Sequence, residues 1–187
     1  MKNKQYIIFD LDGTLADSFT IVANACKRVF ARLAPTMMPA DKYWNTLRST
    51  DMEQKFSEMA EMAGMDLKDF RSMYDEEYAV DCTSGTKPIM QQYEKLKEAR
   101  GKGFGIIVLT NKRQHIAEQV CSHLFSEGEI DIVIGREDTQ PIKPRHVLSD
   151  RLHAHHIEPR AQCLMYYGDS DADYKSAELL CVPYTKV

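Results

Sequence analysis

Apolar residues follow two different patterns along the chain. Continuous apolar runs, as expected of parallel strands that are buried on both faces, occur at residues 6–9 and 104–109, and further strands are expected at 130–134, 163–167 and 182–187. Apolar residues at helical spacing predict helices at about 88–101, 114–125, 145–153 and 174–180. Because strands and helices alternate, we predict the α/β fold class, with a doubly wound, Rossmann-like parallel sheet and right-handed crossovers.

A purely helical pattern interrupts this alternation after the first strand. Four amphipathic helices are expected in succession: about 18–33, 41–48, a third that opens at the capping box Thr50–Glu53 and stops at Gly64, and a fourth from Asp66 to Tyr78. We interpret them as a small helical cap at 17–84, inserted into an α/β core formed by 1–16 and 85–187. Its hinges would be Ala16–Asp17 and Asp81–Gly85.

The composition is that of an ordinary globular protein of 187 residues, with 43% apolar and 28% charged residues. A net charge of −4 without a basic run argues against a nucleic-acid partner, and no apolar window approaches membrane-spanning length. With no leader-like segment before the first strand, we expect a cytoplasmic protein. Five widely spaced cysteines suggest neither disulfides nor a metal site, and the histidines at 153, 155 and 156 lack partners at metal-binding spacing.

Polar side chains gather where three of the expected strands end. Asp10 and Asp12 follow the first strand, Thr110 and Asn111 the second, and an acidic stretch at 169–173 follows the strand at 163–167. Each could be simple turn or capping chemistry, and Lys143 could be a solvated loop residue. In parallel strands, however, these ends meet at one edge of the sheet. Carboxylates with a lysine are suited to Mg²⁺-assisted phosphoryl transfer.

The same segments resemble four motifs of the haloacid dehalogenase superfamily, in its phosphoglycolate phosphatase-like branch. They are Phe9–Ser18, Leu109–Lys112, Lys143–Pro144, and Gly168–Ser170 with Asp173 and Ala177. The helical segment stands where that branch carries its cap. The third motif departs from the usual Lys-Pro-x-Pro, since Arg145 and His146 follow Pro144.

The resemblance implies a Mg²⁺-dependent phosphatase that hydrolyses a small-metabolite phosphomonoester, either phosphoglycolate-like or a sugar phosphate. Asp10 would be the nucleophile, forming an aspartyl-phosphate, and Asp12 the general acid and base. Mg²⁺ would be bound by the Asp10 carboxylate, the Asp12 backbone carbonyl and Asp169, with Asp173 supporting it through water. The residues expected to hold the phosphoryl group are Thr110, Asn111 and Lys143.

Two other functions remain open at this point. A sugar phosphomutase of the same superfamily shares both acids, although Thr14 favours hydrolysis. A non-catalytic phospho-acceptor module resembling receiver domains also uses Asp, Thr, Lys and Mg²⁺, but has neither an acid at the place of Asp12 nor a helical cap. Cap residues would select the substrate; Tyr43, Trp44 and Arg48 are candidates for this role and equally for the cap's own core or surface. The chain could also form an oligomer.

Overall fold

A computed structural model describes residues 4–49, 52–138 and 141–187. The chain divides into two compact units: an α/β unit that comprises the chain up to Asp17 together with Lys87–Val187, and a helical unit, Ser18–Thr86. These boundaries lie within two residues of those expected from the sequence. Among the described residues, none of the helices combines the length and apolar character needed to cross a membrane.

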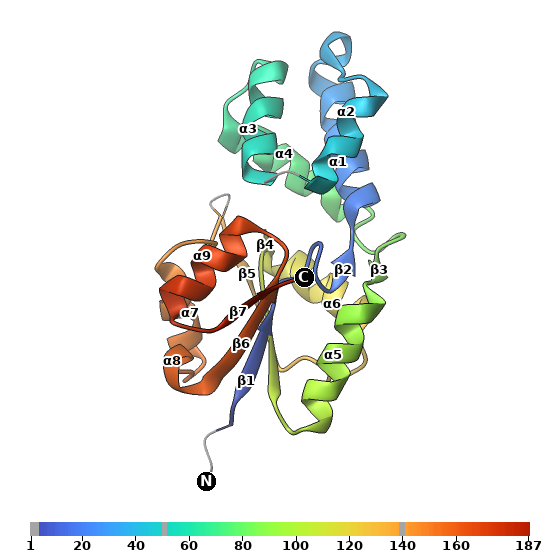
Figure 1. Ribbon diagram of the computed structural model, residues 1–187. Helices are drawn as coiled ribbons and strands as arrows, with labels where there is room; N and C mark the ends of the chain where they lie inside the picture. Colours follow the sequence, from blue (N-terminus) through green and yellow to red (C-terminus); the bar gives the residue numbers. More distant parts are fainter. Residues whose placement is uncertain (1–3, 50–51, 139–140) are drawn as a thin grey trace. The chain divides into compact units, whose positions relative to one another are not determined.

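The α/β unit is built on one parallel sheet in the order β5-β4-β1-β6-β7 (Figure 1). Its strands are β1 (Tyr6–Phe9), β4 (Gly105–Arg113), β5 (Ile132–Arg136), β6 (Cys163–Gly168) and β7 (Tyr184–Lys186). The central strand β1 is apolar because both of its faces are covered, and Ile8 and Phe9 are fully buried. The predicted fold class is confirmed.

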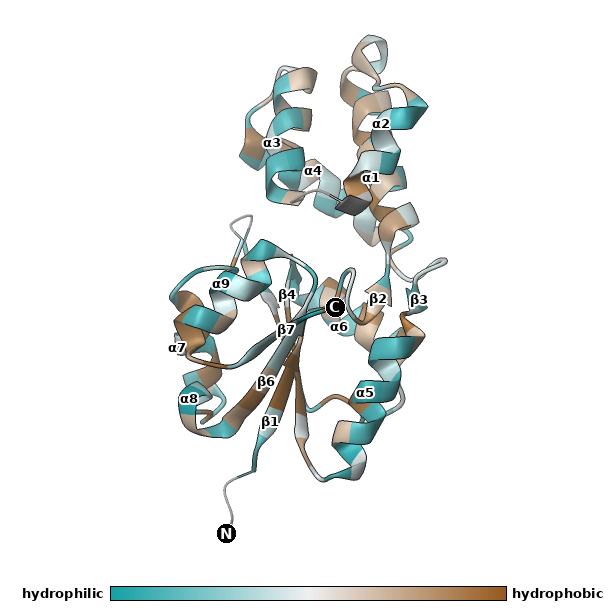
Figure 2. Ribbon diagram, viewed as in Figure 1, coloured by the Kyte–Doolittle hydropathy of each residue, from teal (hydrophilic) through white to brown (hydrophobic). Residues whose placement is uncertain are grey.

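Helices cover both faces of this sheet (Figure 1). They are α5 (Met90–Gly101), α6 (Gln114–Leu124), α7 (Val147–Ala154), α8 (Pro159–Gln162) and α9 (Asp171–Leu180). Leu148 and Leu152 of α7 and Leu180 of α9 pack with the strand residues Ile107 and Tyr166 in one buried cluster. Figure 2 shows the hydrophobic residues on the strands and the polar ones on the outer surface of α5.

Two short strands differ from the sequence expectation. β2 (Ala16–Asp17) pairs antiparallel with β3 (Lys87–Pro88), so the two connections between the units run side by side. Pro88, expected in the first turn of a helix, lies in β3, and α5 begins only at Met90. Two-residue strands are too short to give a periodic signal, which is why the sequence does not reveal them.

The helical unit contains α1 (Phe19–Leu33), η1 (Pro35–Met37), α2 (Asp41–Asn45), η2 (Thr46–Ser49), α3 (Met52–Ala63) and α4 (Leu67–Ala79). Phe30 is fully buried and meets Trp44 and Phe70 edge to face at its centre. Trp44 is therefore a core residue of this unit. Asp66 caps α4 by accepting a hydrogen bond from the Lys68 amide. The expected capping box begins at Thr50 and Asp51, which lie outside the described residues.

Candidate active site

The end of β1 brings Asp10 into the interior of the α/β unit. The Asp10 amide donates to the Tyr167 carbonyl of β6 at 2.9 Å, and only 4% of the residue is exposed. Beyond it the chain turns back tightly, since the amides of Leu15 and Ala16 both donate to the Leu11 carbonyl. Gly13 has φ +83° in this turn, a left-handed conformation that suits glycine.

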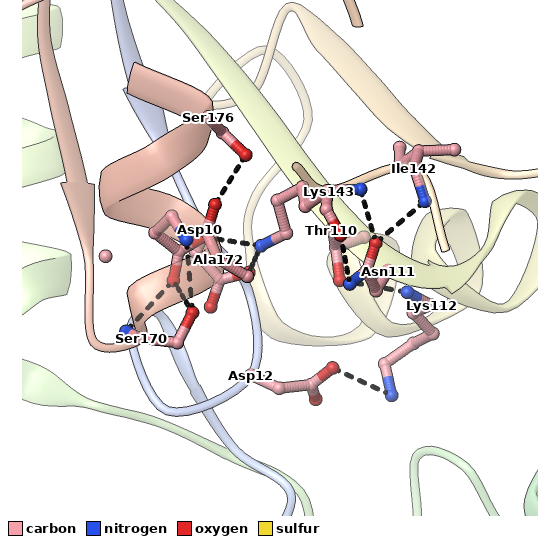
Figure 3. A network of polar contacts seen from close by, with 12 residues as sticks. Asp10, Asp12, Thr110, Asn111, Lys112, Ile142, Lys143, Ser170, Ala172 and Ser176 are labelled. Atoms are coloured by element: carbon pink, nitrogen blue, oxygen red, sulfur yellow. Dashed lines mark hydrogen bonds and ion pairs between the residues drawn. The ribbon is translucent and has the colours of Figure 1, made fainter. Parts of the chain in front are cut away.

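Lys143 reaches Asp10 from the loop that follows β5. Its ammonium donates to Asp10 Oδ1 at 2.5 Å (Figure 3) and to Asp173 Oδ1 at 2.6 Å. All three residues are buried. Asn111 of β4 fixes this loop, because its Oδ1 accepts the amides of Ile142 at 2.9 Å and Lys143 at 2.8 Å. The Asn111 side chain therefore supports the residue that contacts Asp10.

Asp173 lies in the first turn of α9, directly after β6. Its Oδ1 accepts hydrogen bonds from Lys143 and from the Tyr166 hydroxyl at 2.9 Å, and its Oδ2 accepts from the amide of Ser170 at 3.1 Å and its hydroxyl at 2.5 Å. In return Ser170 Oγ accepts the Asp173 amide, which completes the capping box that starts α9. The helix start and the polar cluster thus depend on each other.

Asp10, Asp169 and Asp173 form a cluster of carboxylates with one oxygen of each within 4.8 Å of the others. Lys143 supplies one positive charge against these three carboxylates, so the cluster keeps excess negative charge in a buried place. A hard divalent cation with oxygen ligands would neutralise it, and carboxylate oxygens are the ligands that Mg²⁺ prefers. The donor set therefore fits the expected metal.

Burial and charge act on the acids of this cluster in different ways. Burial raises the pKa of Asp10 well above its ordinary value, with Lys143 opposing and the other carboxylates adding to the rise. Burial, followed by the charge of Asp173, raises the pKa of Asp169 to about 6. Burial also disfavours the charged form of Asp173, but Lys143, Ser170 and Tyr166 outweigh it and lower its pKa.

Asp12 lies apart from this cluster. Its Oδ2 forms an ion pair with Lys112 Nζ at 3.1 Å (Figure 3), and its side chain is 34% exposed whereas that of Lys112 is 6% exposed. Thr110 is buried, and its hydroxyl accepts the Lys112 amide at 3.2 Å. Lys112 was not among the expected site residues; its place directly after Thr110 and Asn111 was the available signal.

The fold and the site define an α/β enzyme with a carboxylate cluster at the carboxyl edge of a parallel sheet. The family model described as "Haloacid dehalogenase-like hydrolase" matches residues 7–187. The chain therefore belongs to the haloacid dehalogenase-like hydrolases, which confirms the prediction of that family and of a hydrolytic enzyme.

Individual relatives are distant. A phosphoglycolate phosphatase of Aquifex aeolicus (strain VF5) is 25% identical over 180 residues, which are 92% of this chain and 79% of that protein. One of Yersinia pestis is 24% identical over 188 residues, covering 95% and 78%. A haloacid dehalogenase-like hydrolase from Streptococcus pneumoniae has a structure that matches with a TM-score of 0.74 at 21% identity, over 100% of this chain and 85% of that one. At this identity the structural match shows the fold alone.

Proposed function

We propose that the protein is a Mg²⁺-dependent phosphatase that hydrolyses a small-metabolite phosphomonoester through an aspartyl-phosphate on Asp10. The observation that carries this proposal is the buried contact of Asp10 with Lys143, beside two further carboxylates and two residues before Asp12. A carboxylate nucleophile, a cation for the phosphoryl oxygens and a second acid are the groups that such a hydrolysis needs.

Asp10 provides the nucleophile. One of its oxygens attacks phosphorus, the bond from phosphorus to the ester oxygen breaks, and the phosphoryl group is transferred to Asp10. The Lys143 ammonium favours the ionised form of Asp10 that can attack. In the second step a water oxygen attacks phosphorus, the bond to Asp10 breaks, and inorganic phosphate leaves.

Asp12 provides the proton transfers. As an acid it protonates the departing alcohol oxygen, and as a base it then accepts a proton from the attacking water. The ion pair with Lys112 holds the Asp12 carboxylate near the site while leaving a third of its side chain exposed. An acid that remains accessible in this way can meet the leaving group of a bound substrate.

Lys143, Thr110 and Asn111 are assigned to the phosphoryl group. Lys143 offsets negative charge on the phosphoryl oxygens, and Asn111 holds the loop from which Lys143 extends. Asp10, Asp169 and the backbone carbonyl of Asp12 would hold Mg²⁺. When bound, the ion neutralises charge on the carboxylates and on the phosphate.

The helical unit is the candidate cap that selects the leaving group. The relatives from Aquifex aeolicus and Yersinia pestis are named phosphoglycolate phosphatases, which makes 2-phosphoglycolate the first substrate to test. Because Trp44 is 3% exposed in the core of the helical unit, we assign it to packing; Tyr43 remains a candidate for substrate contact.

The test is phosphate release from a panel of esters, with Mg²⁺ and with a chelator. The panel contains 2-phosphoglycolate, glucose 6-phosphate, glucose 1-phosphate, pyrophosphate and p-nitrophenyl phosphate. We expect release that requires Mg²⁺ and that falls at least about a thousandfold in Asp10→Asn. Asp150→Asn, the same substitution at an exposed position of α7, should match the wild type.

Other outcomes would identify the alternatives. Transfer of phosphate between positions of a sugar, without free phosphate, would indicate a phosphomutase. An Asp10 phosphoenzyme that persists for minutes without turnover would indicate a phospho-acceptor module. Either result would contradict the phosphatase.

A further inference from the structure

Two tyrosines lie side by side on the neighbouring strands β6 and β7, and the chemistry proposed above uses neither of them. Tyr166 is fully buried in β6, and Tyr184 is half-buried in the neighbouring strand β7. They are register partners across the two strands, and their ring centroids lie 6.1 Å apart. The Tyr166 hydroxyl donates to a carboxylate of the cluster, that of Asp173, whereas the Tyr184 hydroxyl donates to backbone carbonyls on either side of Asp169.

The Tyr166 hydroxyl acts on Asp173. It donates to Oδ1, the oxygen that also accepts Lys143, while Ser170 occupies Oδ2 with its amide and its hydroxyl. An ionised carboxylate offers about four acceptor positions, and these four donors fill them. Asp173 is thereby oriented as the partner of Lys143, and Lys143 in turn is held against Asp10.

The Tyr184 hydroxyl acts on the backbone around Asp169. It donates to the carbonyl of Gly168 at 2.9 Å and, more weakly, to that of Ser170 at 3.4 Å, and these carbonyls flank Asp169 on both sides. Burial, followed by the charges of Asp173, Asp169 and Asp10, raises the pKa of Tyr184 to about 12. A tyrosine hydroxyl keeps its proton at neutral pH even with an ordinary pKa, so that of Tyr184 remains a donor.

We infer that the two tyrosines are positioning residues with separate tasks. Tyr166 holds the pair formed by Asp173 and Lys143 for phosphoryl transfer, and Tyr184 holds the Asp169 segment for Mg²⁺ binding. This inference rests on the proposed function, because the two tasks are defined by that chemistry. It assigns the Tyr166 hydroxyl mainly to kcat and the Tyr184 hydroxyl mainly to the affinity for Mg²⁺.

Tyrosine-to-phenylalanine variants test the inference, since they remove one hydroxyl and keep the ring. We expect Tyr166→Phe to lower kcat about tenfold and to change the Kd for Mg²⁺, measured calorimetrically on the free protein, less than about twofold. Tyr184→Phe should weaken Mg²⁺ binding about tenfold, with the smaller effect on kcat at saturating Mg²⁺. For these measurements, kcat is determined with the ester of the panel that the wild type hydrolyses best.

The chain offers a matched control in Tyr174. Its ring contacts Tyr184 at 5.6 Å, but its hydroxyl donates to Glu178 on the surface of α9. Tyr174→Phe should leave both quantities at the wild-type level. Thermal unfolding of all three variants distinguishes a local effect from a general loss of stability.

The inference is overturned if Tyr166→Phe and Tyr184→Phe each lower kcat and the affinity for Mg²⁺ in the same proportion. It is also overturned if neither variant differs from Tyr174→Phe in these two quantities. Failure of the proposed function is recognised separately, by a wild type that hydrolyses none of the esters. In that case the affinity for orthovanadate at saturating Mg²⁺ replaces kcat as the measure of the phosphoryl site. Tyr166→Phe must then weaken orthovanadate binding more than Mg²⁺ binding, and Tyr184→Phe must weaken Mg²⁺ binding more than orthovanadate binding.

Discussion

Asp169 occupies space that a side chain at position 13 would need. A Cβ built on Gly13 would lie 2.3 Å from Asp169 Oδ2, and Gly13 also has φ +83°. Glycine is thus required here for two independent reasons, its backbone conformation and the close approach of a carboxylate. The second reason connects the turn after β1 directly with the carboxylate cluster.

We therefore predict that Gly13→Ala weakens Mg²⁺ binding and lowers turnover at least about tenfold, because Asp169 must move away from the new methyl group. Gly128→Ala is the matched control: Gly128 has φ +82°, but a Cβ there meets nothing within 4 Å. Both variants should lose about 1–2 kcal/mol of stability from backbone strain. Equal Mg²⁺ affinity in the two would contradict the role given to Asp169.

The sequence indicates candidate site residues, but it does not indicate their contacts. Asp10, Asp12 and Asp169 stand where apolar runs end, which is a local signal. The ion pair of Asp12 with Lys112 joins two segments that are distant in the sequence. The hydrogen bond from Tyr166 to Asp173 joins the two sides of the turn between β6 and α9. Their side-chain directions depend on how the strands pack, and a single sequence carries no pattern for that.

Among the elements, α1 and α4 of the helical unit are joined by charges as well as by apolar packing. Arg28 of α1 donates to Glu77 of α4 through Nε at 3.0 Å and to its carbonyl at 2.6 Å, and it also bonds both oxygens of Asp81. Arg32, one turn further along α1, donates to Glu77 as well. The hydrogen bonds from Arg32 and Arg28 outweigh desolvation and lower the pKa of Glu77.

Arg28→Ala should accordingly lower the free energy of unfolding of the helical unit by about 1 kcal/mol at pH 7. The stabilisation is fully present above the unfolded pKa of Glu77 and is lost as the pH falls through its lowered folded pKa. Wild type and variant should therefore converge at acidic pH, below the lowered pKa of Glu77. Trp44, the single tryptophan of the chain, reports this unit by fluorescence during urea unfolding.

Lys42→Ala serves as the control, since Lys42 is an exposed cation of the same unit. It should leave the urea midpoint unchanged at neutral and at acidic pH. A difference between wild type and Arg28→Ala that persists unchanged at low pH would show that lost packing, and not the pairing with Glu77, is responsible.

How far elements can be predicted depends on their length. Apolar runs of four and five residues predict β1 and β6. β4 extends further than expected, to Arg113, which pairs with Arg136 of β5 after a shift in register beyond Leu109. The four-residue helix α8 and the strands β2 and β3 were not foreseen. The pairing of β2 with β3 is decided by contacts between residues distant in the sequence, which outweigh weak local preferences.

At the scale of the whole molecule, the chain leaves and re-enters the α/β unit at one place. Asp17 and Lys87 are register partners in the β2–β3 pair, and Ala16 pairs with Pro88. All residues of the carboxylate cluster, together with Lys143, belong to the α/β unit. The helical unit could therefore be removed without removing any residue of the carboxylate cluster and without separating the ends that it joins.

We predict that replacing Ser18–Thr86 by Asn-Gly yields an α/β unit that folds alone. A two-residue Asn-Gly turn suits a hairpin whose last partners are Asp17 and Lys87. The shortened protein should unfold cooperatively and bind Mg²⁺ within about tenfold of the full chain, while its kcat/KM for the best ester falls at least about a hundredfold because the reacting groups stay open to water. A shortened protein that folds and retains full selectivity across the ester panel would remove the cap role from the helical unit. One that folds but no longer binds Mg²⁺ would show that the helical unit contributes to the metal site itself.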